Sequence, residues 1–198
     1  EIPWTNVSNS PFRLFKRWIH EGGISAPLIV HWPSVIKESR IESEQLHIMD
    51  IPATAIHAAN AKYPDEYNGN KIKQIEGESF LDLLVNRWSR EKPMYWEHEG
   101  NQGIRKGEWK LVKEYDQDWE LYNLSEDRTE LKDLSSKEKK RVEEMAIEWE
   151  EWAKISNVLP WPVNPNVLAK RLEGDHAHIH QHRGPTAGQI ADGKGKFL

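Results

Sequence analysis

The sequence predicts an α/β protein that ends in a smaller α+β part. That part is a four-stranded antiparallel sheet packed on one long C-terminal helix. Three observations support this prediction. An apolar run bounded by prolines, residues 27–33, is typical of a buried strand in an α/β sheet. From residue 94, four short strand candidates follow one another, separated by turns that contain Gly or Asp. A long segment with apolar residues at helical spacing comes directly after them.

Residues 1–90 are predicted to form the last elements of the larger α/β domain. After the apolar run and a polar linker, Asp50 begins a predicted helix that continues to about Ala59, with Pro52 in its first turn. The loop-like residues 63–77 separate it from a short amphipathic helix over 78–85. The apolar positions expected to face inward are Ile51, Ala55, Ile56 and Ala59 in the first helix, and Phe80, Leu81 and Leu84 in the second.

Residues 91–161 are predicted to form the smaller part. Its strand candidates are MYWEH (94–98), QGIRK (102–106), EWKLVKEY (108–115) and WELYNL (119–124). The helix is predicted to begin with a capping box, Ser135 with Glu138. Its apolar stripe, expected to cover the sheet, is Val142, Met145, Ala146, Trp149, Trp152 and Ala153. Residues 162–198 show little periodicity and are predicted to be a tail or an extended arm.

Composition excludes several classes of protein. The 198 residues carry a net charge of −5, which argues against a nucleic-acid binder. No apolar run approaches the roughly 18–20 residues that span a bilayer. Cysteine is absent, so disulfides, thiol nucleophiles and cysteine-based metal sites are excluded. The opening residues, EIPWTNVSNSPF, read like the middle of a protein, and no signal sequence is visible.

Lys16 is the leading candidate for a functional side chain. It lies five residues before Glu21-Gly22-Gly23, where two consecutive glycines predict a tight turn with positive φ. A cation beside such a turn can meet an anionic ligand. The alternative is an ordinary loop with a solvated lysine. On a helix, Arg13 and Arg17 would share a face that Lys16 does not, so both arginines are interpreted as surface charges.

Three segments together resemble the sulfatase family, which includes the arylsulfatases and belongs to the alkaline-phosphatase-like superfamily. The first is FRLFKRWIHEGGISAPLIVHWP, residues 12–33, and the second is MYWEHEGNQGIRKGEWKL, residues 94–111. The third is ELYNL, residues 120–124, followed by Asp127, Glu130 and Asp133. The resemblance covers roughly residues 1–161. It implies the C-terminal region of a sulfatase: the end of an alkaline-phosphatase-like α/β domain, then the smaller C-terminal subdomain.

The resemblance also implies an activity, hydrolysis of an aryl or sugar sulfate ester, and site residues. In this family a lysine ahead of the E-G-G turn contacts the sulfate, so Lys16 is the predicted catalytic residue. The turn that carries His98 and Asn101 is near the mouth of the active site, which makes these two the predicted substrate-binding residues. The alternative for His98 is that it satisfies a turn. Packing and a salt bridge are the preferred interpretation of Arg105, Trp109 and Lys110.

The family uses Ca²⁺ and a formylglycine made from a [C/S]-x-P-x-R motif. That motif and a D-N-G metal segment are not found, since Ser8-Asn9-Ser10-Pro11 lacks the required order. The nucleophile and metal ligands are therefore expected outside this chain, which should be inactive alone. The resemblance implies a periplasmic or secreted location. We also expect Leu28–Val30 to expose apolar surface, leading to an oligomer, low solubility or association with a missing N-terminal part.

Two other functions stay open: a phosphate-ester hydrolase of the same superfamily, and a non-catalytic module whose tryptophan-rich part binds a glycan or a partner protein. A run of alternating histidines adds a question about metal binding. It consists of His176, His178, His180 and His182. On a strand these imidazoles would share a face and could bind zinc, copper or nickel. In a flexible tail, which we favour, they would be an adventitious chelator.

Overall fold

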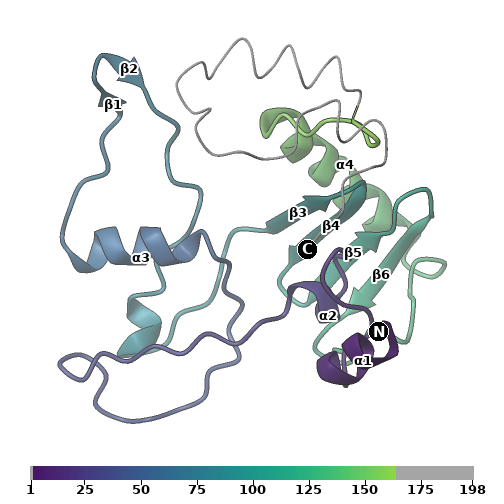
Figure 1. Ribbon diagram of the computed structural model, residues 1–198, viewed down its shortest axis with the longest axis horizontal. Coiled ribbons are helices and arrows are strands. Elements are labelled where there is room, and N and C mark those ends of the chain that lie inside the picture. Colours follow the sequence, from purple (N-terminus) through teal and green to yellow (C-terminus); the bar gives the residue numbers. More distant parts are fainter. Residues whose placement is uncertain (1, 164–198) are drawn as a thin grey trace.

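The computed structural model describes residues 2–163 (Figure 1). The four alternating histidines lie outside the described residues. Within these residues the helices are α1 (Ile2–Asn9), α2 (Glu21–Ile24), α3 (Asp50–Ala58) and α4 (Lys139–Ile155), with a 3₁₀ turn η1 (Asp82–Leu84). The strands are β1 (Glu66–Tyr67), β2 (Asn70–Lys71), β3 (Met94–His98), β4 (Asn101–Lys106), β5 (Trp109–Lys113) and β6 (Trp119–Asn123). In residues 2–163 every helix is too short or too polar to span a bilayer.

The four strands β3 to β6 form the predicted antiparallel sheet, in sequence order. The pairing of His98 with Asn101 leaves Glu99 and Gly100 as a two-residue turn, and both have positive φ, 50° and 81°. Such turns match the twist of the flanking strands, which explains the glycine there. The predicted meander is confirmed.

Helix α4 covers one face of the sheet, as predicted from its apolar stripe. Ile104, Leu111 and Leu121 point from three strands into a core with Met145 and Trp149 of the helix. The predicted capping box is wrong, however, because the helix begins only at Lys139 and Glu138 occupies the N-cap position without a side-chain hydrogen bond. The Ser135 hydroxyl instead donates to Asp133, at 2.8 Å from Oδ2.

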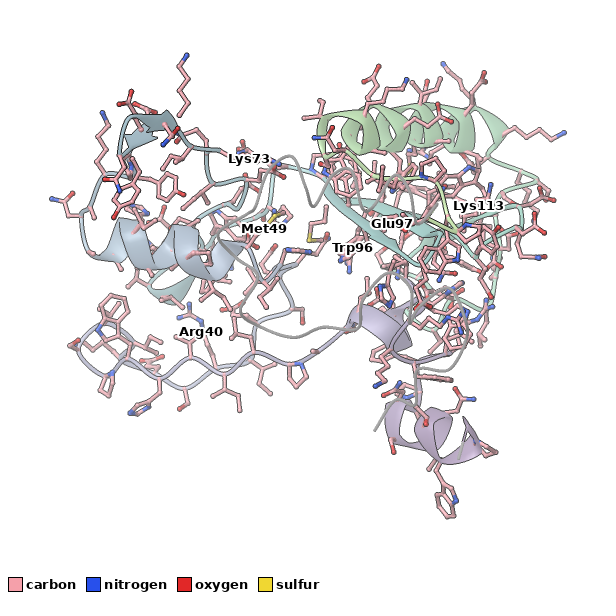
Figure 2. All side chains as sticks on the ribbon, turned by 45° about the horizontal axis from the view of Figure 1, so that its top comes forward. Arg40, Met49, Lys73, Trp96, Glu97 and Lys113 are labelled. Carbon is pink, nitrogen blue, oxygen red and sulfur yellow. The ribbon has the colours of Figure 1, made fainter. Side chains whose placement is uncertain are left out.

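Residues 12–24 cover the opposite face of the sheet. Figure 2 shows α4 above the sheet and α2 below it. Ile19 packs there against Val112, Tyr122 and Leu124 in a second apolar cluster. A Cβ at Gly103 would lie 2.3 Å from Ile19 Cγ2, so glycine at this strand position lets the segment approach the sheet closely. The sheet is therefore the middle of three layers.

The predicted strand over residues 27–33 does not form. Within the described residues no other strand pairs with it, so its backbone has no ladder to join. Leu28, Ile29 and Val30 are 46%, 91% and 39% exposed, which confirms the expected apolar surface. In Figure 1 this segment leads from α2 to α3, the β1–β2 hairpin and η1, which lie apart from the β3–β6 sheet.

Helix α3 is confirmed, but the expected apolar inner face is wrong. Its buried residues are Asp50 and Thr54, whereas Ile51 is 45% exposed. Asp50 accepts hydrogen bonds from the backbone N–H groups of His47 and Glu78, so the polar side chain fastens the helix to its neighbours.

The predicted helix over 78–85 is shorter in the structure. It contracts to the 3₁₀ turn η1, with Phe80 and Leu83 buried rather than Phe80, Leu81 and Leu84. A single turn of this kind places only every third side chain inward, which explains the shift from Leu84 to Leu83.

Candidate functional site

A pocket of about 380 Å³ brings two of the predicted site residues together. Phe15, Lys16 and Arg17 line one side, and His98 and Glu99, at the β3–β4 turn, line the other. Lys16 and His98 are both exposed. Among residues 2–163, Lys16 has no carboxylate partner, so its ammonium group is available to an anion in the pocket.

The segment that carries Lys16 is irregular, and the helical interpretation of the arginines is wrong. Leu14 and Arg17 have positive φ, 64° and 105°, which a helix does not allow. Arg17 therefore lines the same pocket as Lys16, where its Nε lies 2.7 Å from Glu99 Oε2. Arg13 is not a surface charge, because its guanidinium donates to the Tyr122 hydroxyl at 3.0 Å.

Asn101 holds the two sides of this pocket together. Its side chain is buried, and its Nδ2 donates to the carbonyl oxygens of Arg17, at 3.2 Å, and His98, at 2.9 Å. Its Oδ1 accepts the backbone N–H of Tyr115 at 3.1 Å. The amide thus braces the Lys16 segment on the β3–β4 turn. A contact between Asn101 and substrate stays a prediction.

The two glycines of the E-G-G turn have a different role from the one predicted. The glycines with positive φ in the described chain are Gly69, Gly100 and Gly107, so the φ argument for Gly22 and Gly23 is wrong. A Cβ on Gly22 would lie 2.3 Å from the Arg13 carbonyl oxygen, and one on Gly23 would lie 2.0 Å from that of Trp18. Glycine is needed here because the Lys16 segment folds directly onto α2.

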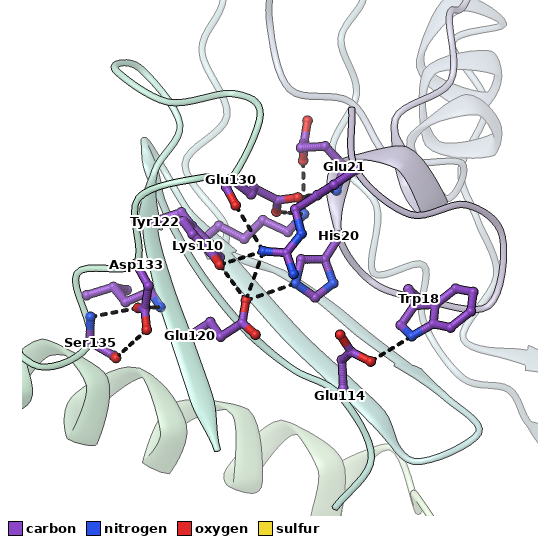
Figure 3. Close-up of polar contacts among 12 residues, drawn as sticks. Trp18, His20, Glu21, Lys110, Glu114, Glu120, Tyr122, Glu130, Asp133 and Ser135 are labelled. Atoms are coloured by element: carbon purple, nitrogen blue, oxygen red, sulfur yellow. Dashed lines mark hydrogen bonds and ion pairs between the residues drawn. The ribbon is translucent and has the colours of Figure 1, made fainter. Parts of the chain in front are cut away.

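Glu21 anchors the turn to the sheet through a buried group of three charges (Figure 3). Lys110 Nζ lies 3.0 Å from Glu21 Oε1 and 2.7 Å from Glu130 Oε1, and each of the three side chains is at most 2% exposed. The backbone N–H of Glu21 also donates to Glu130 Oε2 at 2.7 Å. Burial alone would raise the pKa of Glu21, but the charge and hydrogen bond of Lys110, with Arg105 and Arg128, bring it below its usual value.

A second buried contact lies beside the first, between His20 and Glu120. His20 Nε2 lies 3.2 Å from Glu120 Oε2, and because a carboxylate only accepts, this nitrogen carries the hydrogen. The Tyr122 hydroxyl and Arg13 donate to the same oxygen. The hydrogen bond from His20 outweighs burial and, with Tyr122 and Arg13, lowers the pKa of Glu120 to about 2. Glu120 thus holds the His20 end of the turn as an ionised carboxylate.

The low pKa of Glu120 makes the attachment of residues 12–24 sensitive to acid. Because its folded pKa of about 2 lies below the usual 4.5, its stabilising effect is complete above pH 4.5 and is lost as the pH falls toward 2. We expect Glu120→Gln to destabilise the fold at pH 7 and to make progressively less difference below pH 4.5. Unfolding midpoints of both proteins from pH 7 to 2.5 test this. A difference that stays constant over that range would contradict it.

His20, Glu114 and Glu120 also come close enough to hold a metal ion, with ligand atoms within 4.8 Å of one another. The group does not fit calcium, which prefers six to eight oxygen ligands. Arg13 already lies on Glu120, and the Trp18 indole donates to Glu114 at 2.9 Å. His20 Nδ1 has no hydrogen-bond partner, so a metal on Nε2 would leave its N–H without an acceptor. No step through calcium or formylglycine is assigned to residues 2–163.

Comparison with known proteins identifies the family. The protein-family model described as N-sulphoglucosamine sulphohydrolase, C-terminal, matches residues 12–154 of this chain. The chain belongs to the sulfatases, as the resemblance of its three motifs predicted. An uncharacterized sulfatase of Schizosaccharomyces pombe is 32% identical over 158 residues, which cover 74% of this chain and 28% of that protein.

The chain is also similar to a second relative and, more distantly, to a solved structure. A sulfatase of Formosa agariphila is 30% identical over 146 residues, covering 65% of this chain and 26% of the relative. The structure of BT1596, a 2-O GAG sulfatase, is 21% identical with a TM-score of 0.41 and covers 71% of this chain and 31% of that one. The chain spans about a quarter of the length of the curated relatives it matches.

Proposed function

We propose that this chain is the C-terminal part of a sulfatase that hydrolyses sulfate esters, and that it contributes the sulfate-binding lysine. The observation that carries the proposal is the position of Lys16 and His98, which are far apart in the sequence, on one pocket. Lys16 is the cation of that pocket without a carboxylate partner in residues 2–163, which suits the single negative charge of a sulfate ester.

In this proposal Lys16 holds the sulfuryl oxygens and stabilises the charge that grows on them in the transition state. Its ammonium hydrogens also hold the ester oxygen in place as the bond to sulfur breaks. His98 donates a hydrogen bond to the same anion and orients it. Asn101 positions Lys16 and His98, since its Nδ2 donates hydrogen bonds to the carbonyl oxygens of Arg17 and His98. In the family, the formylglycine and Ca²⁺ supply the attacking group and further charge, and we place both outside this chain.

The substrate we propose is an aryl or sugar sulfate, met in the periplasm or outside the cell. The chain alone is proposed to turn over no ester, because it lacks cysteine and the [C/S]-x-P-x-R motif. The exposed Leu28, Ile29 and Val30 favour association with the rest of the sulfatase or with a second copy.

The test compares sulfate with phosphate esters in the intact sulfatase that contains this chain. We expect one or more aryl or sugar sulfates to be hydrolysed with a kcat/KM about 100-fold above that of the matched phosphate. A preference for phosphate would instead support the phosphate-ester hydrolase. Hydrolysis of neither, with binding of unsulfated glycans, would support the non-catalytic module.

A further inference from the structure

The proposed sulfate pocket contains a second cation, Arg17, that the proposed chemistry does not use. It is held by Glu99 across the pocket, with 2.7 Å between Arg17 Nε and Glu99 Oε2. Both side chains remain accessible, at 59% and 36% exposed. An exposed ion pair contributes little to stability, so a ligand anion can replace Glu99 at low cost.

The backbone conformation at residues 16 and 17 lets two neighbouring cations, Lys16 and Arg17, line one pocket. On a helix or a strand, side chains 16 and 17 would point in different directions. Here Arg17 takes a φ of 105°, which is rare and unfavourable for any residue but glycine. Asn101 holds this conformation through the Arg17 carbonyl oxygen. With this backbone conformation, Lys16 and Arg17 line the same space.

The position of Glu99 is set independently, by the β3–β4 hairpin. Glu99 and Gly100 form its two-residue turn with positive φ. The turn carries Glu99 to the pocket beside His98, where it neutralises Arg17 but not Lys16. A ligand with one anionic group pairs with Lys16 alone. A ligand with two anionic groups can also displace Glu99 and pair with the planar guanidinium of Arg17.

We propose that Arg17 determines specificity for substrates that carry a second anionic group, a sulfate or a carboxylate, beside the sulfate held by Lys16. Glu99 occupies Arg17 until such a substrate arrives. This inference rests on the proposed function, because it takes the Lys16 pocket to be the sulfate site. It adds the substrate class: sulfate esters with at least two negative groups on neighbouring parts of the molecule.

Binding of small sulfonates to the intact sulfatase tests the inference without turnover. The probes are ethanesulfonate with one anionic group, ethane-1,2-disulfonate with two, and 3-sulfopropanoate, whose second group is a carboxylate. Calorimetry should give the doubly charged probes a Kd about tenfold lower than that of ethanesulfonate. In Arg17→Gln this preference should fall to about twofold for the disulfonate, the statistical advantage of its two equivalent ends, and should disappear for 3-sulfopropanoate, while the Kd of ethanesulfonate changes less than that of either doubly charged probe. Arg87→Gln, at an exposed arginine away from the pocket, is the matched control and should keep the full preference.

Glu99→Gln removes the competitor of the ligand for Arg17. It should tighten binding of the doubly charged probes about two- to fivefold and that of ethanesulfonate by less, since one anionic group does not pair with both cations. A gain with either the disulfonate or 3-sulfopropanoate supports the inference and identifies the second group. Equal affinities for all three probes, or an equal loss for all three in Arg17→Gln, would overturn it. If ethanesulfonate binds equally well to wild type and Lys16→Ala, the proposed sulfate site itself is wrong.

Discussion

Replacing Lys16 with alanine is expected to lower kcat/KM for sulfate esters about 100- to 1,000-fold, the usual effect of losing one donor to a developing negative charge. Lys16 is the pocket cation without a carboxylate partner in the described chain, so no neighbouring group replaces it when it is removed. The loss should be mainly in kcat, because the charge on the sulfuryl oxygens is greatest in the transition state. Steady-state kinetics of the intact sulfatase on its best sulfate ester measure both constants.

Lys132→Ala is the matched control for this experiment. Lys132 is also exposed, but it follows β6 in a loop and does not line the pocket. It should retain wild-type kinetics. If Lys16→Ala changed kcat/KM by less than about threefold, the proposed role of Lys16 would be rejected, since an interaction worth less than about 1 kcal/mol is typical of an exposed charge.

The sequence predicted the smaller part well because its signals are local. Each strand of the β3–β6 sheet is five or six residues long and is bounded by a turn that contains Gly or Asp, and the turn at Gly100 is set by the two residues that form it. The stripe of α4 repeats over the 17 residues of that helix. Neighbouring strands joined by short turns need no information from distant parts of the chain, so composition and turn residues place them.

The salt bridge expected for Lys110 is confirmed, but its partners on this face of the sheet were not predicted, because they are distant in sequence. Lys110 and Glu120 precede the core residues Leu111 and Leu121, and alternation of this kind normally indicates a solvent-facing side. In the structure that face is covered by residues 12–24. The available signal was the charge pattern: Glu21 in the first motif had a complementary Lys110 in the second.

The strand predicted at Leu28 did not form for a different reason. Its composition is that of a buried strand, but a strand needs hydrogen-bonding neighbours, and residues 2–163 supply none for it.

The shape of the pocket could not be predicted from the sequence for a third reason. The conformation of Arg17 depends on Asn101 from the β3–β4 turn, and a positive φ at a non-glycine residue has no signature in the sequence.

Lys110→Met should destabilise the attachment of the Lys16 segment by about 3–5 kcal/mol, the usual result of removing one partner from a buried ion pair. The variant leaves Glu21 and Glu130 buried near each other without the cation between them. Arg105 and Arg128, at 3.9 Å and 3.5 Å from Glu21, are weaker substitutes because neither contacts Glu130 within ion-pair distance in the described residues.

Hydrogen exchange of the intact sulfatase measures this loss locally. The amides of α2 should lose protection about 100-fold or more, since each 1.36 kcal/mol corresponds to a factor of ten. Lys106→Met on the neighbouring strand is the control, because its ion pair with Glu148 is exposed and should change protection by less than about tenfold. Adding Glu130→Gln to Lys110→Met should restore part of the protection, since it removes one of the uncompensated charges. Unchanged protection in Lys110→Met would mean that Ile19 and the glycine contacts hold the segment without the ion group. In that case the position of Lys16 would depend on packing rather than on charge.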